Sequence, residues 1–77
     1  MADQHITHGV IKILDVVGVS QESFSDAVRQ AVRGASKSVR GISGVEVTHS
    51  SAKVSDGEIT EYHVSVRLAF PVEGASD

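Results

Sequence analysis

The first patterned stretch of the chain, residues 10–17, reads VIKILDVV and is largely apolar on both of its alternating faces. Its β-branched residues and short length predict a strand, ended by Gly18, rather than a helix. A single helix covers only one side of a sheet, so the pattern indicates that something else must cover the other side. One face carries Val10, Lys12, Leu14 and Val16, and the other carries Ile11, Ile13, Asp15 and Val17.

A helical pattern follows, in which apolar residues recur at steps of three and four. Ser20 and Ser23 are both candidate N-caps, and Ser23 stands at capping-box spacing from Asp26. Gly34 in the helix interior indicates a close backbone approach, and Gly41 is expected to end the helix in a left-handed conformation. The apolar stripe consists of Phe24, Ala27, Val28, Ala31, Val32, Ala35 and Val39.

Two further strands are expected at residues 45–54 and 58–70, around an Asp-Gly pair that is typical of a tight hairpin. Pro71 should end the second strand, whose core face alternates with a polar face. The element order predicts an α+β fold, a β-α-β-β subunit whose three-stranded antiparallel sheet wraps around one helix. We expect one domain over residues 9–73, a flexible tail at 1–8 and another at 74–77. The expected core face carries Tyr62, Val64, Val66, Leu68 and Phe70.

Composition changes this picture in three ways. The chain has 77 residues and no cysteine, so its thin core is best supplemented by association between copies. A formal charge of -3 without a basic cluster argues against nucleic acid, and Phe24, Tyr62 and Phe70 are all expected in the core rather than stacked on bases. No apolar run approaches the roughly 20 residues of a membrane span, and the N-terminus lacks signal-peptide features, so we expect a cytoplasmic protein without membrane partners.

The histidines are the clearest candidates for site chemistry. His5 and His8 lie in the expected tail without organised carboxylates or thiolates, so no metal site is predicted there. His49 and His63 stand at similar distances from the turn on the two hairpin strands, and we expect them to be neighbours across the ladder. Their role stays open between a polar inter-subunit surface and ligand contact. Because no serine has a nucleophile-elbow setting and the acids are scattered, an enzyme is not expected.

Taken together, these motifs resemble the dodecin family over about residues 10–73. The shared features are VVGxS at the end of the first strand, ESF and DAV at the helix start, ASK at its end, VEV, the DGxIxEYxVxV hairpin and the closing AF. The resemblance implies subunits that assemble into hollow homododecamers of cubic symmetry. It also implies a non-enzymatic function, in which flavins of the riboflavin and FMN class are bound and stored or sequestered.

The resemblance further implies where a flavin would bind. The aromatic residue that stacks on the isoalloxazine ring in flavin-binding members corresponds to Gly44, and a ring-binding glutamine corresponds to His63. Basic residues that hold the ligand's tail correspond to positions near Ser51 and Pro71. None of these four residues keeps the family's ligand chemistry.

The missing aromatic matters because stacking contributes roughly 1–3 kcal/mol per ring, so its loss weakens binding by about tenfold to over a hundredfold. Two functions therefore stay open. The first is a flavin-binding shell with an altered site. The alternative is a dodecin-like assembly without strong flavin binding, which is structural or holds another small molecule or cation.

Overall fold

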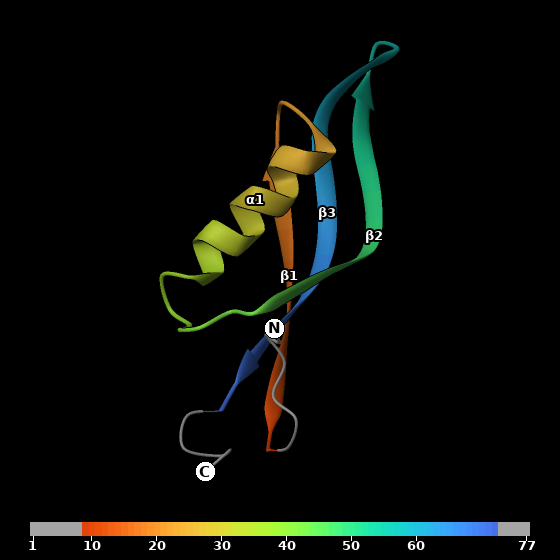
Figure 1. Cartoon of the computed structure of the whole chain (residues 1–77). Coiled ribbons are helices and arrows are strands. Elements are labelled where there is room, and N and C mark those ends of the chain that lie inside the picture. Colours follow the sequence, from red (N-terminus) through yellow and green to blue (C-terminus); the bar gives the residue numbers. More distant parts are fainter. Residues whose placement is uncertain (1–8, 73–77) are drawn as a thin grey trace.

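The computed structural model describes residues 9–72. Strand β1 (Ile11–Ser20) is followed by helix α1 (Phe24–Ala35), strand β2 (Gly44–Ser55) and strand β3 (Glu58–Pro71) (Figure 1). The strands form one three-stranded sheet in the order β1-β3-β2, and both outer strands run antiparallel to β3. The predicted α+β fold is confirmed. The predicted tails at 1–8 and 74–77, with His5 and His8, lie outside the described residues.

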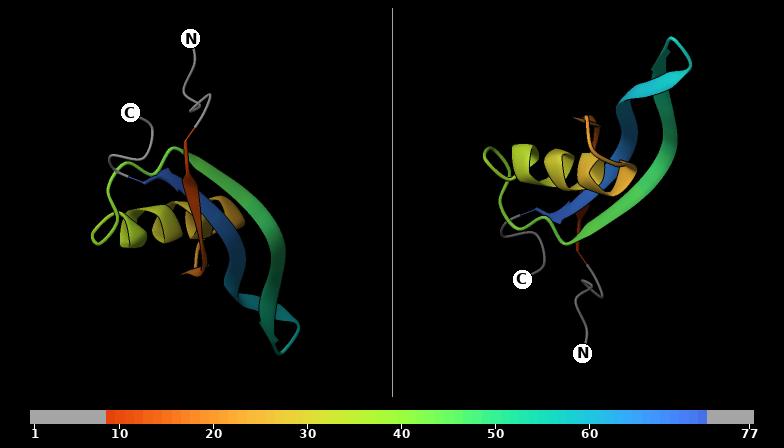
Figure 2. Two further views of the ribbon diagram at one scale, coloured as in Figure 1. Left: turned by 90° about the horizontal axis from the view of Figure 1, so that it is seen from below. Right: turned by 90° about the horizontal axis from the view of Figure 1, so that it is seen from above.

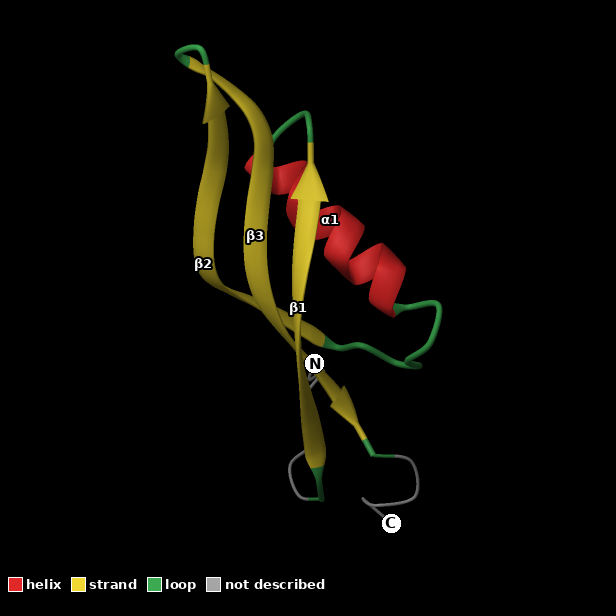
Figure 3. Cartoon of the chain, turned by 180° about the vertical axis from the view of Figure 1, so that it is seen from behind, coloured by secondary structure: helices red, strands yellow, loops and turns green. Residues whose placement is uncertain are grey.

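The core lies between α1 and the two strands β1 and β3, and the helix crosses one side of the sheet (Figure 3). We call this side the inner face. The alternation predicted for β3 is confirmed, since every second residue points into the core and Leu68 is fully buried. Tyr62 and Phe70, at the two ends of this set, are half-buried. The buried cluster consists of Ala27, Ala31, Val64, Val66 and Leu68.

Strand β1 does not end at Gly18, as the sequence indicated, but continues to Ser20. The reason is packing, because a Cβ at Gly18 would overlap the carbonyl oxygen of Ala27 in α1. Glycine at this position lets the helix approach the strand closely. Its role is to permit this packing, and it does not end the strand.

Of the two candidate N-caps, Ser23 is the one used, and its Oγ accepts a hydrogen bond from the backbone N–H of Asp26 at 2.9 Å. The buried Ser20 has a different role. Its Oγ accepts from the backbone N–H of Glu22 at 2.8 Å and donates to Asp26 Oδ2 at 2.8 Å. That hydrogen bond from Ser20 holds the pKa of Asp26 below its usual value, and it ties the end of β1 to the first turn of α1.

The end of the helix differs from the prediction. Helix α1 stops at Ala35 with Ser36 as C-cap, and Gly41 lies in the connection to β2 with φ of +72°. The apolar period continues to Val39, whose backbone N–H still donates to the carbonyl of Ala35 at 2.9 Å, but the chain already turns here. The close approach expected at Gly34 is also wrong within one chain, because a Cβ there meets nothing within 4 Å.

The β2–β3 hairpin projects past α1 and β1 (Figures 1 and 2). Asp56 and Gly57 at its turn both have positive φ, 53° and 78°, as the predicted tight hairpin requires. Two register irregularities bend the hairpin, one at Thr48 in β2 and one at Thr60 in β3, opposite Lys53 and Val54. The hairpin therefore curves away from the layer formed by α1, β1 and β3.

The expectation that all three aromatic residues lie in the core is wrong. Phe24 is 41% exposed, while Tyr62 and Phe70 are half-buried. Phe24 packs edge-on against Tyr62, with ring centroids 4.8 Å apart and an interplanar angle of 78°. Neither ring is fully covered by the described residues.

Candidate functional site

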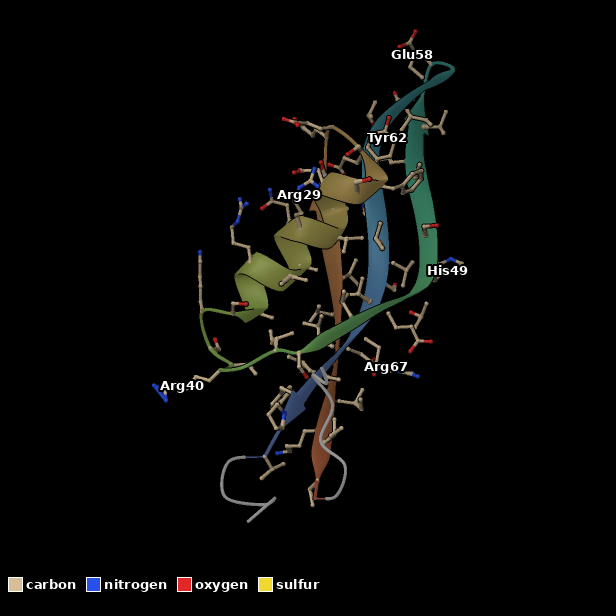
Figure 4. All side chains as sticks on the ribbon, in the orientation of Figure 1. Arg29, Arg40, His49, Glu58, Tyr62 and Arg67 are labelled. Carbon is tan, nitrogen blue, oxygen red and sulfur yellow. The ribbon has the colours of Figure 1, made fainter. Side chains whose placement is uncertain are left out.

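The side of the sheet that faces away from α1 carries every sheet position that the sequence singled out for a ligand, and we call it the outer face. Its β1 part is apolar except for Asp15, and Ile13 and Val17 are 53% and 58% exposed. Its β2 and β3 parts are mostly polar, and Figure 4 shows His49 and Arg67 pointing away from the helix. The register assigns to the polar part Gly44, Glu46, His49, Ser51 and Lys53 from β2, and Glu61, His63, Ser65, Arg67 and Ala69 from β3.

His49 and His63 occupy adjacent ladder pairs of the outer face. Ser51 lies directly opposite His63, and His49 lies opposite Ser65. The two histidines are therefore diagonal neighbours, at a Cα separation on the order of 7–8 Å. The predicted proximity is confirmed, although the two histidines do not lie directly opposite each other. Both pairs lie in one uninterrupted stretch of register, which ends at an irregularity beside Thr48, whose hydroxyl donates to the Ser65 carbonyl at 3.2 Å.

The ring of His63 already has a partner. Its Nε2 lies 2.9 Å from Glu61 Oε1, and both side chains are about one third exposed, at 39% and 33%. This hydrogen bond holds the pKa of Glu61 below its usual value, and the charge of Lys53 on β2 acts in the same direction. One imidazole nitrogen is thus committed within the chain, and the other remains for a ligand.

Gly44 begins β2 at the other end of the outer face, opposite Ala69. A Cβ added there would meet only the Cβ of Ala69, at an ordinary contact distance of 3.7 Å. The backbone is well anchored beside it, because the N–H of Ser43 donates to the Ala69 carbonyl at 2.9 Å. The position therefore offers open space in which the local fold does not require glycine.

The structure brings Ser51 and His63 together, but it does not bring Gly44 to them. Ala69, opposite Gly44, and His63 are six residues apart along β3, which corresponds to about 20 Å at roughly 3.3 Å per residue. A flavin ring system that contacts both Gly44 and His63 must therefore take them from different copies of the chain.

Pro71 ends β3 opposite Ile11, beside a hollow of about 310 Å³ that Lys12 and Arg40 line together with Phe70. Sequence reasoning did not connect these two cationic residues with the site. The only signal was the position of Lys12, on the inner face of an otherwise apolar strand and opposite Phe70. Positive charge thus lies near the end of β3, although Pro71 itself carries none.

At the centre of the outer face lies a second hollow, of about 260 Å³, between β1 and the bend in β2. Asp15 and Val17 line it from β1, and Thr48 and Ser65 line it from the other two strands. Asp15 is held by Arg67, whose Nε donates to its Oδ1 at 3.2 Å. The hollow combines hydrogen-bonding groups with an apolar wall, as small-ligand sites commonly do.

Neither a metal-binding cluster nor a membrane-spanning helix is found among the described residues. Within residues 9–72, no three His, Cys, Asp or Glu side chains are grouped so that they could hold a metal ion. Helix α1, over the same residues, is neither long nor apolar enough to cross a membrane.

Comparisons with known proteins identify the family of this chain. The dodecin family model matches residues 10–73, whereas no curated protein matches significantly. Dodecin from Streptomyces coelicolor is 30% identical, with a TM-score of 0.84 over 90% of this chain and 99% of that chain. The tt0972 protein from Thermus thermophilus is 26% identical, with a TM-score of 0.84 over 88% and 100% of the two chains. Dodecin from Streptomyces davaonensis, at 24% identity, shares the fold with a TM-score of 0.82 over 87% and 98%. From the family model and the 30% identical structure together, we conclude that this chain belongs to the dodecin family.

Proposed function

We propose that the chain assembles into a closed homododecameric shell in the cytoplasm, which binds and stores a flavin of the riboflavin or FMN class without catalysing its conversion. Family membership supports this, because dodecins assemble as homo-oligomers and are known to bind flavins. The observation that carries the proposal is the outer face, where an exposed apolar strip adjoins two separated ligand positions.

The apolar strip supplies a reason to assemble. Its members are between 45% and 58% exposed in the single chain. Complete burial of such a side chain is worth about 1.5–3 kcal/mol, so covering the exposed half of each contributes on the order of 1 kcal/mol. Several of them in every subunit give a substantial driving force for association. The strip consists of Ile11, Ile13, Val17 and Val19.

Assembly also supplies a reason for the site to form only between copies. Gly44 of one subunit and His63 of another would border one flavin, with Ser51 beside His63. The face of the ring would rest on backbone and on small neighbours such as Ala69, and the free imidazole nitrogen would meet the polar edge of the ring. Without an aromatic at Gly44, affinity falls about tenfold to over a hundredfold below that of a stacked site.

Titration of the apo-protein with riboflavin and FMN, followed by flavin fluorescence, tests this function. We expect saturable quenching, with a dissociation constant weaker than that of tryptophan-containing dodecins. Absence of quenching at micromolar protein would remove flavin from the proposal.

A second candidate is a shell of the same architecture without strong flavin affinity, which is structural or holds another small molecule or cation. Two observations favour it: Gly44 leaves the stacking position empty, and Glu61 already engages His63. It predicts the same large particle in light scattering but no response to flavin.

A further inference from the structure

The end of the β2–β3 hairpin is amphipathic, and its apolar side chains are exposed in the described chain. We call residues 54–59 the hairpin tip. Val54 and Ile59 are cross-strand partners there, and they are 61% and 51% exposed. Asp56 and Glu58 add two exposed carboxylates to the same short segment. The tip lies beyond α1 (Figure 1), and the described residues leave these side chains exposed.

A groove of matching character runs along α1. Its volume is about 490 Å³, and we call it the helix groove. Val28 and Val32 form a half-buried apolar floor, and Arg29 and Arg33 form an exposed cationic rim. Both pairs are spaced four residues apart, so each lies along one face of the helix over a single turn. Ser36 closes the groove at the end of the helix.

The positive charge of the rim is only weakly neutralised by the described carboxylates. The side chain of Arg29 is 63% exposed, and its contact with Asp26 Oδ1 is long, at 3.8 Å. In a chain of formal charge -3, two guanidinium groups beside two valines form a local concentration of positive charge. Such a groove favours an occupant that is apolar at its base and carries carboxylates.

The hairpin tip has this chemistry, yet it cannot reach the helix groove of its own chain. Figure 4 shows Glu58 at the far end of the hairpin, well apart from Arg29 on the helix. We infer that the hairpin tip of one copy docks in the helix groove of a second copy. Val54 and Ile59 then cover Val28 and Val32. The carboxylates of Asp56 and Glu58 meet the rim formed by Arg29 and Arg33.

This contact joins two different surfaces, so it propagates from copy to copy and closes into a ring when the rotation between neighbours allows it. The inference rests on the proposed homo-oligomer and adds the contact that holds neighbouring subunits together. It also gives the projecting hairpin a role, because an exposed, partly apolar strand end is otherwise a liability for aggregation.

Charge reversal tests the pairing. In the full-length protein, Arg33→Glu and Glu58→Arg should each raise the concentration at which the assembly dissociates at least tenfold, because each places like charges together. The double variant, Arg33→Glu with Glu58→Arg, should recover most of the loss. Sedimentation velocity over a dilution series measures all three, and circular dichroism confirms that every variant is folded.

Two matched controls use charge reversals outside both surfaces. Lys37→Glu changes a cation just past the helix, and Glu22→Lys changes an exposed acid before it. Both should dissociate at the wild-type concentration. If they weaken the assembly as much as Arg33→Glu and Glu58→Arg do, the effect is one of net charge and the docking contact is refuted.

The absence of cysteine allows a direct second test. Glu58→Cys and Arg33→Cys protein, mixed under oxidising conditions, should form a disulfide-linked dimer between the two variants, and Lys37→Cys should not replace Arg33→Cys. A wild-type protein that stays monomeric overturns both the proposed shell and this contact. An assembled wild type that neither cross-links nor responds to charge reversal overturns the contact alone, and leaves another occupant, such as an amphipathic anion, for the helix groove.

Discussion

The inner and outer faces of the sheet are built from alternate residues of the same strands, and they end in different states. On the inner face, α1 buries Val64, Val66 and Leu68 almost completely. On the outer face, Ile13 and Val17 remain more than half exposed, although they are as apolar as their inner counterparts. The single chain therefore buries the centre of its inner face, whereas the apolar strip on its outer face stays exposed.

The inner and outer faces also differ in how many polar side chains they carry. The inner face of β3 is uniformly apolar from Val64 to Leu68, whereas its outer positions carry Glu61, His63 and Arg67. The buried core therefore lies on the inner face, and the candidate ligand positions and the apolar strip lie on the outer face. Substitutions on the two faces should act on different measurements.

The largest effect is expected on the inner face. Leu68→Ala removes a fully buried side chain, and we expect the free energy of unfolding to fall by about 2–5 kcal/mol. Chemical denaturation, followed by circular dichroism, measures this loss. A loss smaller than that caused by Val17→Ala on the outer face would reverse the comparison between the faces.

On the outer face, Val17→Asp should act on assembly rather than on the subunit fold. A charge in a covered apolar strip forfeits about 1.5–3 kcal/mol of burial per site and adds a desolvation cost. We expect light scattering to show a much smaller particle with unchanged secondary structure. Ser25→Asp, on an exposed position of α1, is the control and should keep the wild-type particle size.

Gly44→Trp sharpens the ligand side of the comparison. The site has room for a side chain, and a stacking ring should tighten flavin binding by about tenfold to a hundredfold, or roughly 1–3 kcal/mol. Fluorescence titration with FMN measures the change. Glu46→Gln, two residues along the same face, should leave affinity within about threefold of wild type, which is below 1 kcal/mol. An unchanged affinity in Gly44→Trp would mean that this position does not face the flavin.

The smallest effect concerns acid stability at the exposed end of the outer face. The folded-state pKa of Glu61 lies below its ordinary value of 4.5 because of its hydrogen bond with His63. The contribution to stability is therefore complete above about pH 4.5 and declines as the pH falls through the lower, folded pKa. His63→Ala should reduce the loss of stability on acidification, measured by thermal unfolding between pH 6 and pH 3. An identical acid profile in the variant would contradict this coupling.

Several features could be predicted because they depend on neighbouring residues alone. The alternation along β3 defines its core face, since successive side chains point to opposite sides. The Asp56–Gly57 pair produces the turn, because both positions require positive φ. The side chain of Ser23 caps the helix by accepting a hydrogen bond from the backbone N–H of Asp26, only three residues away. The two apolar faces of β1 already indicated that one helix leaves one side of the sheet uncovered.

Other features depended on contacts between distant parts of the chain, and only the tertiary structure decided them. Gly18 lies inside β1 because Ala27 packs against it, and the register of β2 on β3 places His49 opposite Ser65 rather than opposite His63. The separation of Gly44 from His63 follows from the register of β2 on β3, and the helix groove follows from how α1 lies on the sheet. Local patterns in a sequence determine which elements form and which of their faces are apolar. The distances between elements are set by packing, and packing depends on residues that are far apart in the chain.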